Sequence, residues 1–303
     1  MVTATQLSSY LYCPRKLFIS NVLLVEEPPK AELVKGKIWH ETYDMINKND
    51  ERIVSGVHTS DYREIFDSYR KNYSKLLRNA IIKNKSALKE FDIKMLDLFK
   101  DYWQSFEEEA KERALNLSAF ITKHKIYGTE LWERLTPKLL SEQYFKSERL
   151  KLSGVIDVIE VHEIHDAKTE KISAEKTSEK IYVPIELKTG KYPEKGMWDG
   201  HRIQLAAYML LLEDAGKNVS EAAMKYRGVD KRVLLMNSFL RQEVIDLIKK
   251  TSAVLDSFDS PKHVDNKNKC KSCQFKEMCY DSREFEKLLI KAKHGRKSQQ
   301  PSI

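Results

Sequence analysis

The sequence contains no long apolar segment. Hydrophobic residues make up 41% of the 303 residues, but charged residues, at 32%, interrupt them throughout, so no 18-residue stretch could span a bilayer. The stretch from Met1 to Tyr12 lacks the basic start and continuous apolar run of a secretory signal peptide. No internal repeat is apparent. These absences exclude a membrane-spanning helix and predict a cytoplasmic protein in a reducing compartment.

Cysteine is scarce, and its placement is informative. The chain has Cys13 near its start and Cys270, Cys273 and Cys279 near its end. Cys270 and Cys273 are too close in sequence to be comfortable disulfide partners, whereas C-x2-C spacing converges readily on one metal. Thiolates in a reducing compartment usually serve metal binding or catalysis. The layout predicts one metal site that joins both ends of the chain, and an all-thiolate zinc site satisfies this spacing too.

The formal net charge of +8 and the pI near 9.0 favour a polyanionic partner such as nucleic acid. The preference is modest, because many soluble proteins are mildly basic without binding nucleic acid. The length allows a substantial core, in one large domain or in two lobes.

The first part of the chain is predicted to be helical. Thr5 is the expected cap of a first helix, Pro14 begins a second that runs to about Asn21, and a third covers residues 30–47. Residues 60–118 have the strongest helical periodicity and predict two long amphipathic helices. Their aromatic residues among Lys and Arg are compatible with a base-stacking surface for single strands, but this spacing is more typical of a packed core.

The sheet is predicted to begin after Pro137. Alternation over residues 144–160 predicts a strand and hairpin, residues 181–188 predict another strand, and the polar residues 164–180 between them predict an exposed, mobile hairpin tip. The remaining elements are short strands over 222–226 and 233–236 and helices over 198–212 and 238–258. This order predicts an α/β core with a helical elaboration.

Two carboxylates and a lysine lie at the ends of predicted strands. Asp157 follows an apolar Gly-Val-Ile run, and Glu186 and Lys188 point to one face of the next strand. Carboxylate oxygens suit Mg2+ or Mn2+, which bridges a phosphate and activates water, while a lysine neutralises developing negative charge. This is a set for phosphodiester hydrolysis, although an ordinary cross-strand salt bridge uses the same residue types.

Two weaker signals accompany this set. Gln204 and Tyr208 lie four residues apart and therefore share one helix face. His40 lies between Trp39 and Glu41 in a predicted helix. Without context, the Gln204–Tyr208 pair is more typical of a helix boundary, and His40 is more often a capping or core-edge histidine than a metal ligand.

In their order along the chain, these segments resemble the CRISPR-associated Cas-four family of RecB-like exonucleases. The resemblance covers about residues 5–280 and rests on these segments: Tyr12-Cys13-Pro14, Trp39-His40, Gly154-Val155-Ile156-Asp157, Glu186-Leu187-Lys188-Thr189-Gly190, Gln204-x3-Tyr208 and Cys270-x2-Cys273-x5-Cys279. It implies a restriction-endonuclease-like PD-(D/E)XK core, a mixed central sheet flanked by helices, with an N-terminal helical lobe. It also implies a [4Fe-4S] cluster that joins the N- and C-terminal segments, an arrangement shared with AddB-type and Dna-two-type helicase-nucleases.

The resemblance also implies roles for single residues. His40, Asp157 and Glu186 match the ligands of Mn2+ or Mg2+, and Lys188 matches the catalytic lysine. Gln204 and Tyr208 match the motif that supports the site and contacts DNA. The cluster ligands would be Cys13, Cys270, Cys273 and Cys279.

The implied activity is metal-dependent DNA cleavage. It is chiefly exonuclease action on single-stranded ends, which trims DNA fragments for the CRISPR adaptation integrase. Two alternatives remain open: a RecB-type repair or recombination nuclease outside CRISPR, and a catalytically silent iron–sulfur subunit that binds DNA.

One feature departs from compact members of the family. The stretch between His40 and Asp157 is longer, because of the helices at 60–118, which we expect to form a lobe over one side of the nuclease cleft. The predicted organisation is therefore N-terminal helices with the first cluster cysteine at 1–30, a helical lobe at 31–136, a nuclease core at 137–260, a cluster-binding segment at 261–285 and a disordered basic tail at 286–303.

Overall fold

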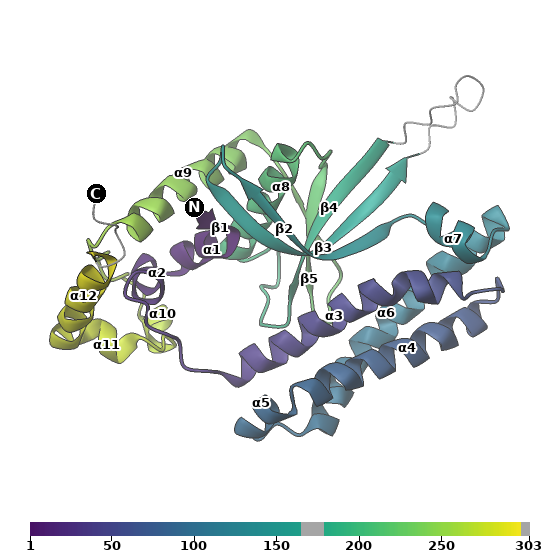
Figure 1. Cartoon of the computed structure of the whole chain (residues 1–303), viewed down its shortest axis with the longest axis horizontal. Coiled ribbons are helices and arrows are strands. Elements are labelled where there is room, and N and C mark those ends of the chain that lie inside the picture. The colour runs from purple at the N-terminus through teal and green to yellow at the C-terminus, as the bar shows by residue number, and fades with distance from the viewer. Residues whose placement is uncertain (165–178, 298–303) are drawn as a thin grey trace.

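A mixed β-sheet with helices on both faces forms the centre of the protein (Figure 1). The computed structural model describes residues 1–164 and 179–297. The strands are β1 (Val2–Thr3), β2 (Lys138–Ser147), β3 (Leu152–Ile164), β4 (Glu179–Lys188), β5 (Glu221–Tyr226) and β6 (Arg232–Leu235). They are ordered β1-β3-β4-β5-β6, and β2 pairs with β3. The pairs β1–β3 and β4–β5 are parallel and the others antiparallel. The predicted α/β fold with a mixed sheet is confirmed.

Helices on one face of the sheet build the predicted lobe, and the others cover the opposite face or connect the two ends (Figure 1). They are α1 (Ala4–Tyr12), α2 (Pro14–Asn21), α3 (Ala31–Ser55), α4 (Tyr62–Lys83), α5 (Lys85–Glu90), α6 (Met95–His124), α7 (Gly128–Arg134), α8 (Asp199–Asp214), α9 (Ser238–Asp256), α10 (Lys267–Lys271), α11 (Lys276–Tyr280) and α12 (Ser282–Lys297). No helix in the described ranges is long and apolar enough to cross a membrane. The cap of α1 is Thr3, not Thr5, because Thr3 forms a capping box with Gln6.

The aromatic stripes of the lobe form a core. Tyr69 and Tyr73 of α4 and Tyr102 of α6 are buried, and Trp39 of α3 packs edge-on against Tyr102 with ring centroids 5.1 Å apart. This cluster continues into the sheet through Val158, Ile185 and Leu187. The core interpretation of these aromatic residues is therefore confirmed over the base-stacking one, and the lobe covers one face of the sheet.

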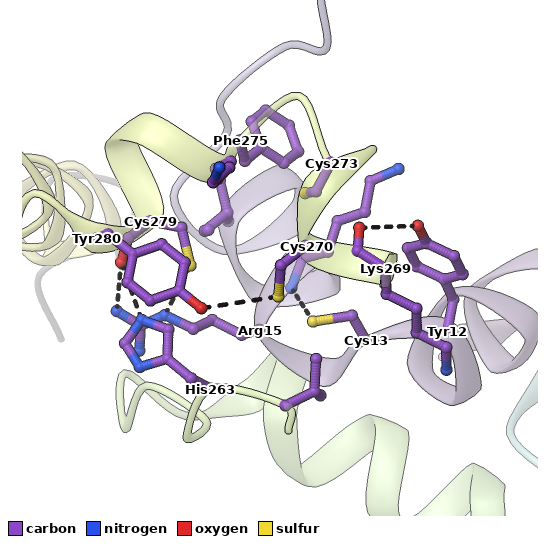
Figure 2. Close-up of a pocket in the computed structure, with 14 residues that line it drawn as sticks. Tyr12, Cys13, Arg15, His263, Lys269, Cys270, Cys273, Phe275, Cys279 and Tyr280 are labelled. Carbon is purple, nitrogen blue, oxygen red and sulfur yellow. Dashed lines mark hydrogen bonds between the residues drawn. The ribbon is translucent and has the colours of Figure 1, made fainter. Parts of the chain in front are cut away.

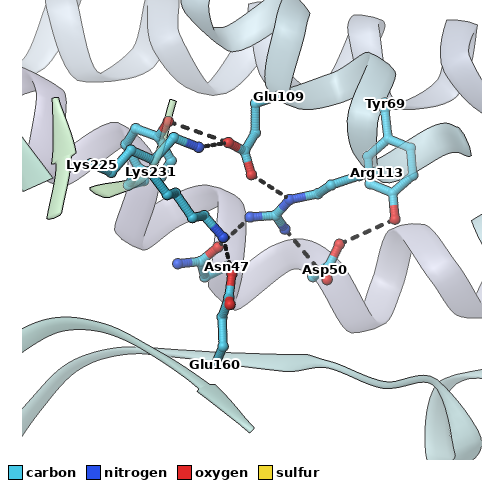
Figure 3. A network of polar contacts seen from close by, with 9 residues as sticks. Asn47, Asp50, Tyr69, Glu109, Arg113, Glu160, Lys225 and Lys231 are labelled. Carbon is cyan, nitrogen blue, oxygen red and sulfur yellow. Dashed lines mark hydrogen bonds and ion pairs between the residues drawn. The ribbon is translucent and has the colours of Figure 1, made fainter. Parts of the chain in front are cut away.

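A buried charge network connects the lobe to the sheet (Figure 3). Glu109 of α6 accepts hydrogen bonds from Lys225 of β5, from Arg113 at 3.0 Å and from the Tyr43 hydroxyl at 3.4 Å. Burial alone would raise the pKa of Glu109, but the Lys225 and Arg113 charges outweigh it and lower the pKa well below its usual value. Glu109 is therefore ionised and held between two cations.

Arg113 extends this network within the lobe. Its guanidinium donates to Asn47 at 2.8 Å and lies 3.4 Å from the Asp50 carboxylate. Asp50 also accepts a hydrogen bond from the Tyr69 hydroxyl at 3.3 Å. Helices α3, α4 and α6 are thus tied to one another by a set of polar contacts that is itself buried (Figure 3).

Close packing against β3 positions α8 on the opposite face of the sheet. A Cβ at Gly154 would lie 2.9 Å from the Tyr208 ring, and one at Gly200 would lie 2.5 Å from Ser8 Oγ. A side chain at Gly154 would therefore displace the Tyr208 ring, and one at Gly200 would displace the Ser8 hydroxyl, so α8 packs closely against both β3 and α1. This packing brings Gln204 and Tyr208 to the ends of the central strands.

The expected disordered tail is wrong over residues 286–297. They continue α12, which ends at Lys297, whereas residues 298–303 lie outside the described part of the chain. The reason is an apolar stripe in this basic segment, with Phe285, Leu288 and Leu289 packed against Phe18 and its neighbours from α2. The predicted mobile hairpin tip falls on residues 165–178, which are also outside the described residues.

Candidate active site

The structure brings the dispersed polar residues predicted from the sequence to one place. His40 comes from α3, Asp157 from β3, Glu186 and Lys188 from the end of β4, and Gln204 and Tyr208 from α8. These side chains are connected by hydrogen bonds and short charge contacts, as described below. The site thus lies between the lobe and the helix on the other face of the sheet.

Asp157 links His40 to strand β4. One carboxylate oxygen lies 3.4 Å from His40 Nδ1, and the other accepts a hydrogen bond from the backbone N–H of Leu187 at 2.8 Å. Burial lowers the pKa of His40, but its hydrogen bond to Asp157 and the negative charges of Asp157 and Glu186 outweigh burial and raise the pKa overall. This hydrogen bond from the backbone of β4 holds the Asp157 carboxylate close to Glu186, the residue that precedes Leu187.

Glu186 is the most enclosed charged group of the site, with only 3% of its surface exposed. Its Oε1 accepts hydrogen bonds from Gln204 at 2.8 Å and from Lys188. Its Oε2 is buried and has no partner among the described residues. Burial, reinforced by the Asp157 charge, raises the pKa of Glu186 to about 7. A buried carboxylate oxygen without a donor costs free energy, and a bound cation would remove that cost.

Lys188 is held in its charged form. Burial lowers its pKa, but the adjacent Glu186 carboxylate outweighs burial and raises the pKa overall. Its side chain is still about a quarter exposed, at 27%. Lys188 therefore carries a positive charge that is still partly exposed.

Gln204 and Tyr208 contact the site from α8. The Gln204 amide donates to Glu186 and also to the Tyr208 hydroxyl, at 2.8 Å each. Both side chains are buried. Because Gln204 touches the carboxylate and Tyr208 touches Gln204, they act as positioning residues for Glu186.

Sequence reasoning missed Glu142 of β2. A carboxylate oxygen of Glu142, a ring nitrogen of His40 and a carboxylate oxygen of Asp157 all lie within 4.8 Å of one another. Glu142 belongs to none of the motif segments, and the pairing of β2 with β3 brings it near Asp157. The donor set of one imidazole and several carboxylates fits Mn2+ or Mg2+.

A second site joins the two ends of the chain (Figure 2). Cys13 lies between α1 and α2, Cys270 is in α10, Cys273 follows it, and Cys279 is in α11. All four are free thiols that line one pocket. Beside it, Phe18 and Ile19 of α2 pack against Phe275 and Phe285 from the C-terminal segment. The predicted meeting of Cys13 with the C-terminal cysteines is confirmed.

Arg15 is a second residue that sequence reasoning missed. Its guanidinium donates to Cys279 Sγ at 3.2 Å and to the carbonyl oxygen of Pro261 at 2.9 Å, and it lies 4.1 Å from the centre of the Phe285 ring. Other donors also reach the sulfurs, with the Lys16 backbone N–H 3.4 Å from Cys13 Sγ and the Tyr280 hydroxyl 3.7 Å from Cys270 Sγ (Figure 2). Burial raises the pKa of the Cys279 thiol overall and outweighs the contact with Arg15, which lowers it.

Comparisons with known proteins agree with the geometry of the first site. The model of the PD-(D/E)XK nuclease superfamily matches residues 1–280. The chain is 26% identical over 173 residues to the "CRISPR-associated exonuclease Cas4/endonuclease Cas1 fusion" of Leptospira interrogans, covering 52% of this chain and 29% of that protein. It is 24% identical over 285 residues to the "DNA replication ATP-dependent helicase/nuclease dna2" of Schizosaccharomyces pombe, covering 92% of this chain and 18% of that protein.

The chain thus spans less than a third of the length of either curated relative. A solved structure titled "Crystal structure of SSO0001" is 15% identical and covers 66% of this chain and 80% of that one. The TM-score between the two is 0.29.

Proposed function

Because the chain belongs to the PD-(D/E)XK nuclease superfamily, we propose that it is a metal-dependent DNA exonuclease that acts preferentially on single-stranded ends. One observation carries the proposal: the buried Glu186 Oε2, which lacks a partner among the described residues, lies in a site with Asp157, His40 and the charged Lys188. A buried carboxylate oxygen without a partner lowers the stability of the fold. The same oxygen is suited to bind a cation beside a phosphate.

Each side chain has a distinct task in this proposal. His40, Asp157 and Glu186 would hold Mn2+ or Mg2+, which would supply Lewis acidity and lower the pKa of a bound water. The Leu187 amide orients Asp157, and Gln204 orients Glu186. The Lys188 ammonium neutralises negative charge that develops on the phosphate during hydrolysis.

Two biological settings fit this activity. We favour trimming of DNA fragments for CRISPR spacer acquisition beside the adaptation integrase, because one relative is named as a fusion of Cas4 with Cas1. The second candidate is a replication or repair nuclease outside CRISPR. It is supported by the match to the dna2 helicase/nuclease, which extends over 92% of this chain.

The nuclease proposal is tested with end-labelled linear DNA, single- and double-stranded, in Mn2+ and after chelation with EDTA. We expect Mn2+-dependent loss of label, faster on the single strand, and no product with EDTA or with Glu186→Gln. A circular single strand of the same sequence is the matched substrate, because it offers no end. Equal cleavage of circle and linear strand would make the enzyme an endonuclease, and DNA binding without any product would favour the silent subunit.

We also propose that Cys13, Cys270, Cys273 and Cys279 bind a [4Fe-4S] cluster whose first role is structural. The shared pocket of the four cysteines and the Arg15, Lys16 and Tyr280 donors beside their sulfurs support a cluster. A cluster here would close a loop of most of the chain and stabilise both ends together.

Replacement of Cys13 tests the cluster proposal. In anaerobically purified protein we expect broad visible absorbance, its loss in Cys13→Ala, and earlier proteolysis of both the N-terminal helices and the segment after residue 261 in that variant. Ser9→Ala, in the helix that precedes Cys13, is the control and should keep the absorbance. A colourless wild-type protein with one zinc ion would contradict the cluster.

A further inference from the structure

The backbone of Glu142 has an unusual conformation for a strand residue. Its φ is 51°, in the left-handed region, inside β2. For residues other than glycine this conformation is sterically unfavourable, and such strained residues cluster at functional sites. Glutamate has no local advantage there, so the surrounding structure imposes this conformation.

The conformation coincides with a change of face in both strands of the hairpin. In β2, Leu139 packs into the core on the lobe side, whereas Phe145 packs into the core on the α8 side, although the two are six residues apart. In β3, Val158 belongs to the lobe-side core and Ile156 to the α8-side core, although they are two residues apart. In a regular strand, residues separated by an even number face the same side.

The change of face occurs at Glu142 in β2 and at Asp157 in β3, between two pairs of opposed residues. Ser141 pairs with Val158, and Gln143 pairs with Ile156. Glu142 and Asp157 are therefore opposite one another at the one step where both strands change face. The left-handed turn at Glu142 thus accompanies the same distortion that presents Asp157 to His40.

The carboxylate of Glu142 is free to bind a ligand. Its side chain is exposed and makes no hydrogen bond or ion pair with the described residues, yet its carboxylate oxygen lies within 4.8 Å of donor atoms of both His40 and Asp157. A second, independent observation points to a cation here: Glu186 Oε2, in the same site, is buried and unpartnered. Three acidic groups beside one another repel, and a divalent cation removes that repulsion.

We propose that Glu142 is a metal-binding residue of this protein, which holds a divalent cation together with His40 and Asp157. The inference rests on the proposed nuclease site and adds to it a fourth metal-binding side chain, supplied by the strand that pairs with β3. The strained backbone at residue 142 is retained because it directs this carboxylate to the cation.

Direct titration of Mn2+ into the metal-free full-length protein, followed by calorimetry and by the electron paramagnetic resonance signal of free Mn2+, tests this inference. We expect Glu142→Gln to weaken Mn2+ binding at least tenfold. Glu148→Gln is the matched control, since Glu148 is exposed and its carboxylate pairs with Lys146, and its affinity should equal that of wild type. Asp157→Asn is the positive control and should lose binding.

Glu142→Gly separates metal binding from a structural role. Glycine adopts the left-handed conformation without strain, so the metal-free variant should unfold at the same or a higher denaturant concentration than wild type, yet bind Mn2+ as weakly as Glu142→Gln. If Glu142→Gln binds like wild type while Asp157→Asn does not, Glu142 is not a ligand and the nuclease proposal stands. If Asp157→Asn also binds like wild type, the metal site itself is wrong and both proposals fall.

Discussion

Replacement of Lys188 by alanine is expected to lower the rate of metal-dependent DNA cleavage by about 10²–10³-fold, the usual effect of removing one charge that stabilises a transition state. Lys188 is the positively charged side chain bound to the Glu186 carboxylate, and it remains partly exposed to a ligand. Glu186 would keep its hydrogen bond from Gln204 in the variant. The carboxylates should therefore stay in place while the charge next to the phosphate is lost.

The measurement is the single-turnover rate on end-labelled single-stranded DNA at saturating Mn2+. Lys191→Ala is the matched control, because Lys191 is exposed and its one hydrogen bond with the described residues uses the backbone carbonyl oxygen, which accepts from the Trp198 indole N–H. Mn2+ affinity, measured separately, should change little in Lys188→Ala. Undiminished cleavage by Lys188→Ala would show that another site or a contaminant degrades the DNA.

Replacement of Glu109 by alanine is expected to have the largest effect on folding, a loss of about 3–5 kcal/mol in the free energy of unfolding. Glu109 is buried and pairs with both Lys225 and Arg113. Without Glu109, the charged side chains of Lys225 and Arg113 remain in a region of low dielectric constant, and each has lost one anionic partner. The lobe and the sheet meet at this contact, so the loss should affect both.

Urea unfolding monitored by circular dichroism and tryptophan fluorescence measures this loss. Glu107→Ala is the matched control on the same helix, because Glu107 pairs with Arg70 in an exposed salt bridge at 2.9 Å. Such surface pairs contribute about 0–1 kcal/mol. Equal destabilisation by the two variants would mean that burial of the network adds nothing to stability.

Local sequence patterns predicted most elements of this fold. The stripes at spacings of three and four became α4 and α6, and the alternation before Asp157 became the β2–β3 hairpin. These predictions succeeded because periodicity records which face of an element is buried, whatever it packs against. The prediction of a disordered tail was wrong because it gave more weight to the charge of this segment than to its apolar stripe. Phe285 and the apolar residues after it have the spacing of a helix.

The residues that matter most beyond the motifs could not be predicted in this way. Glu142 reaches Asp157 through strand register and a left-handed backbone. Arg15 contacts Cys279 across 264 residues of sequence, and Glu109 contacts Lys225 across 116. None of these side chains belongs to a spacing pattern, because their partners are far away in the sequence.

By itself the sequence determined the types and order of the main elements, the family to which the chain belongs, and the identity of His40, Asp157, Glu186 and Lys188 as candidate site residues. Those inferences need only short-range periodicity and the order of motifs along the chain. The tertiary structure alone decided that Glu186 has a buried oxygen without a partner among the described residues, that Glu142 faces Asp157, and that a buried charge network joins lobe and sheet. The physical reason is that burial, pKa and metal-binding geometry depend on distances between atoms, and folding sets those distances for residues that the sequence keeps far apart.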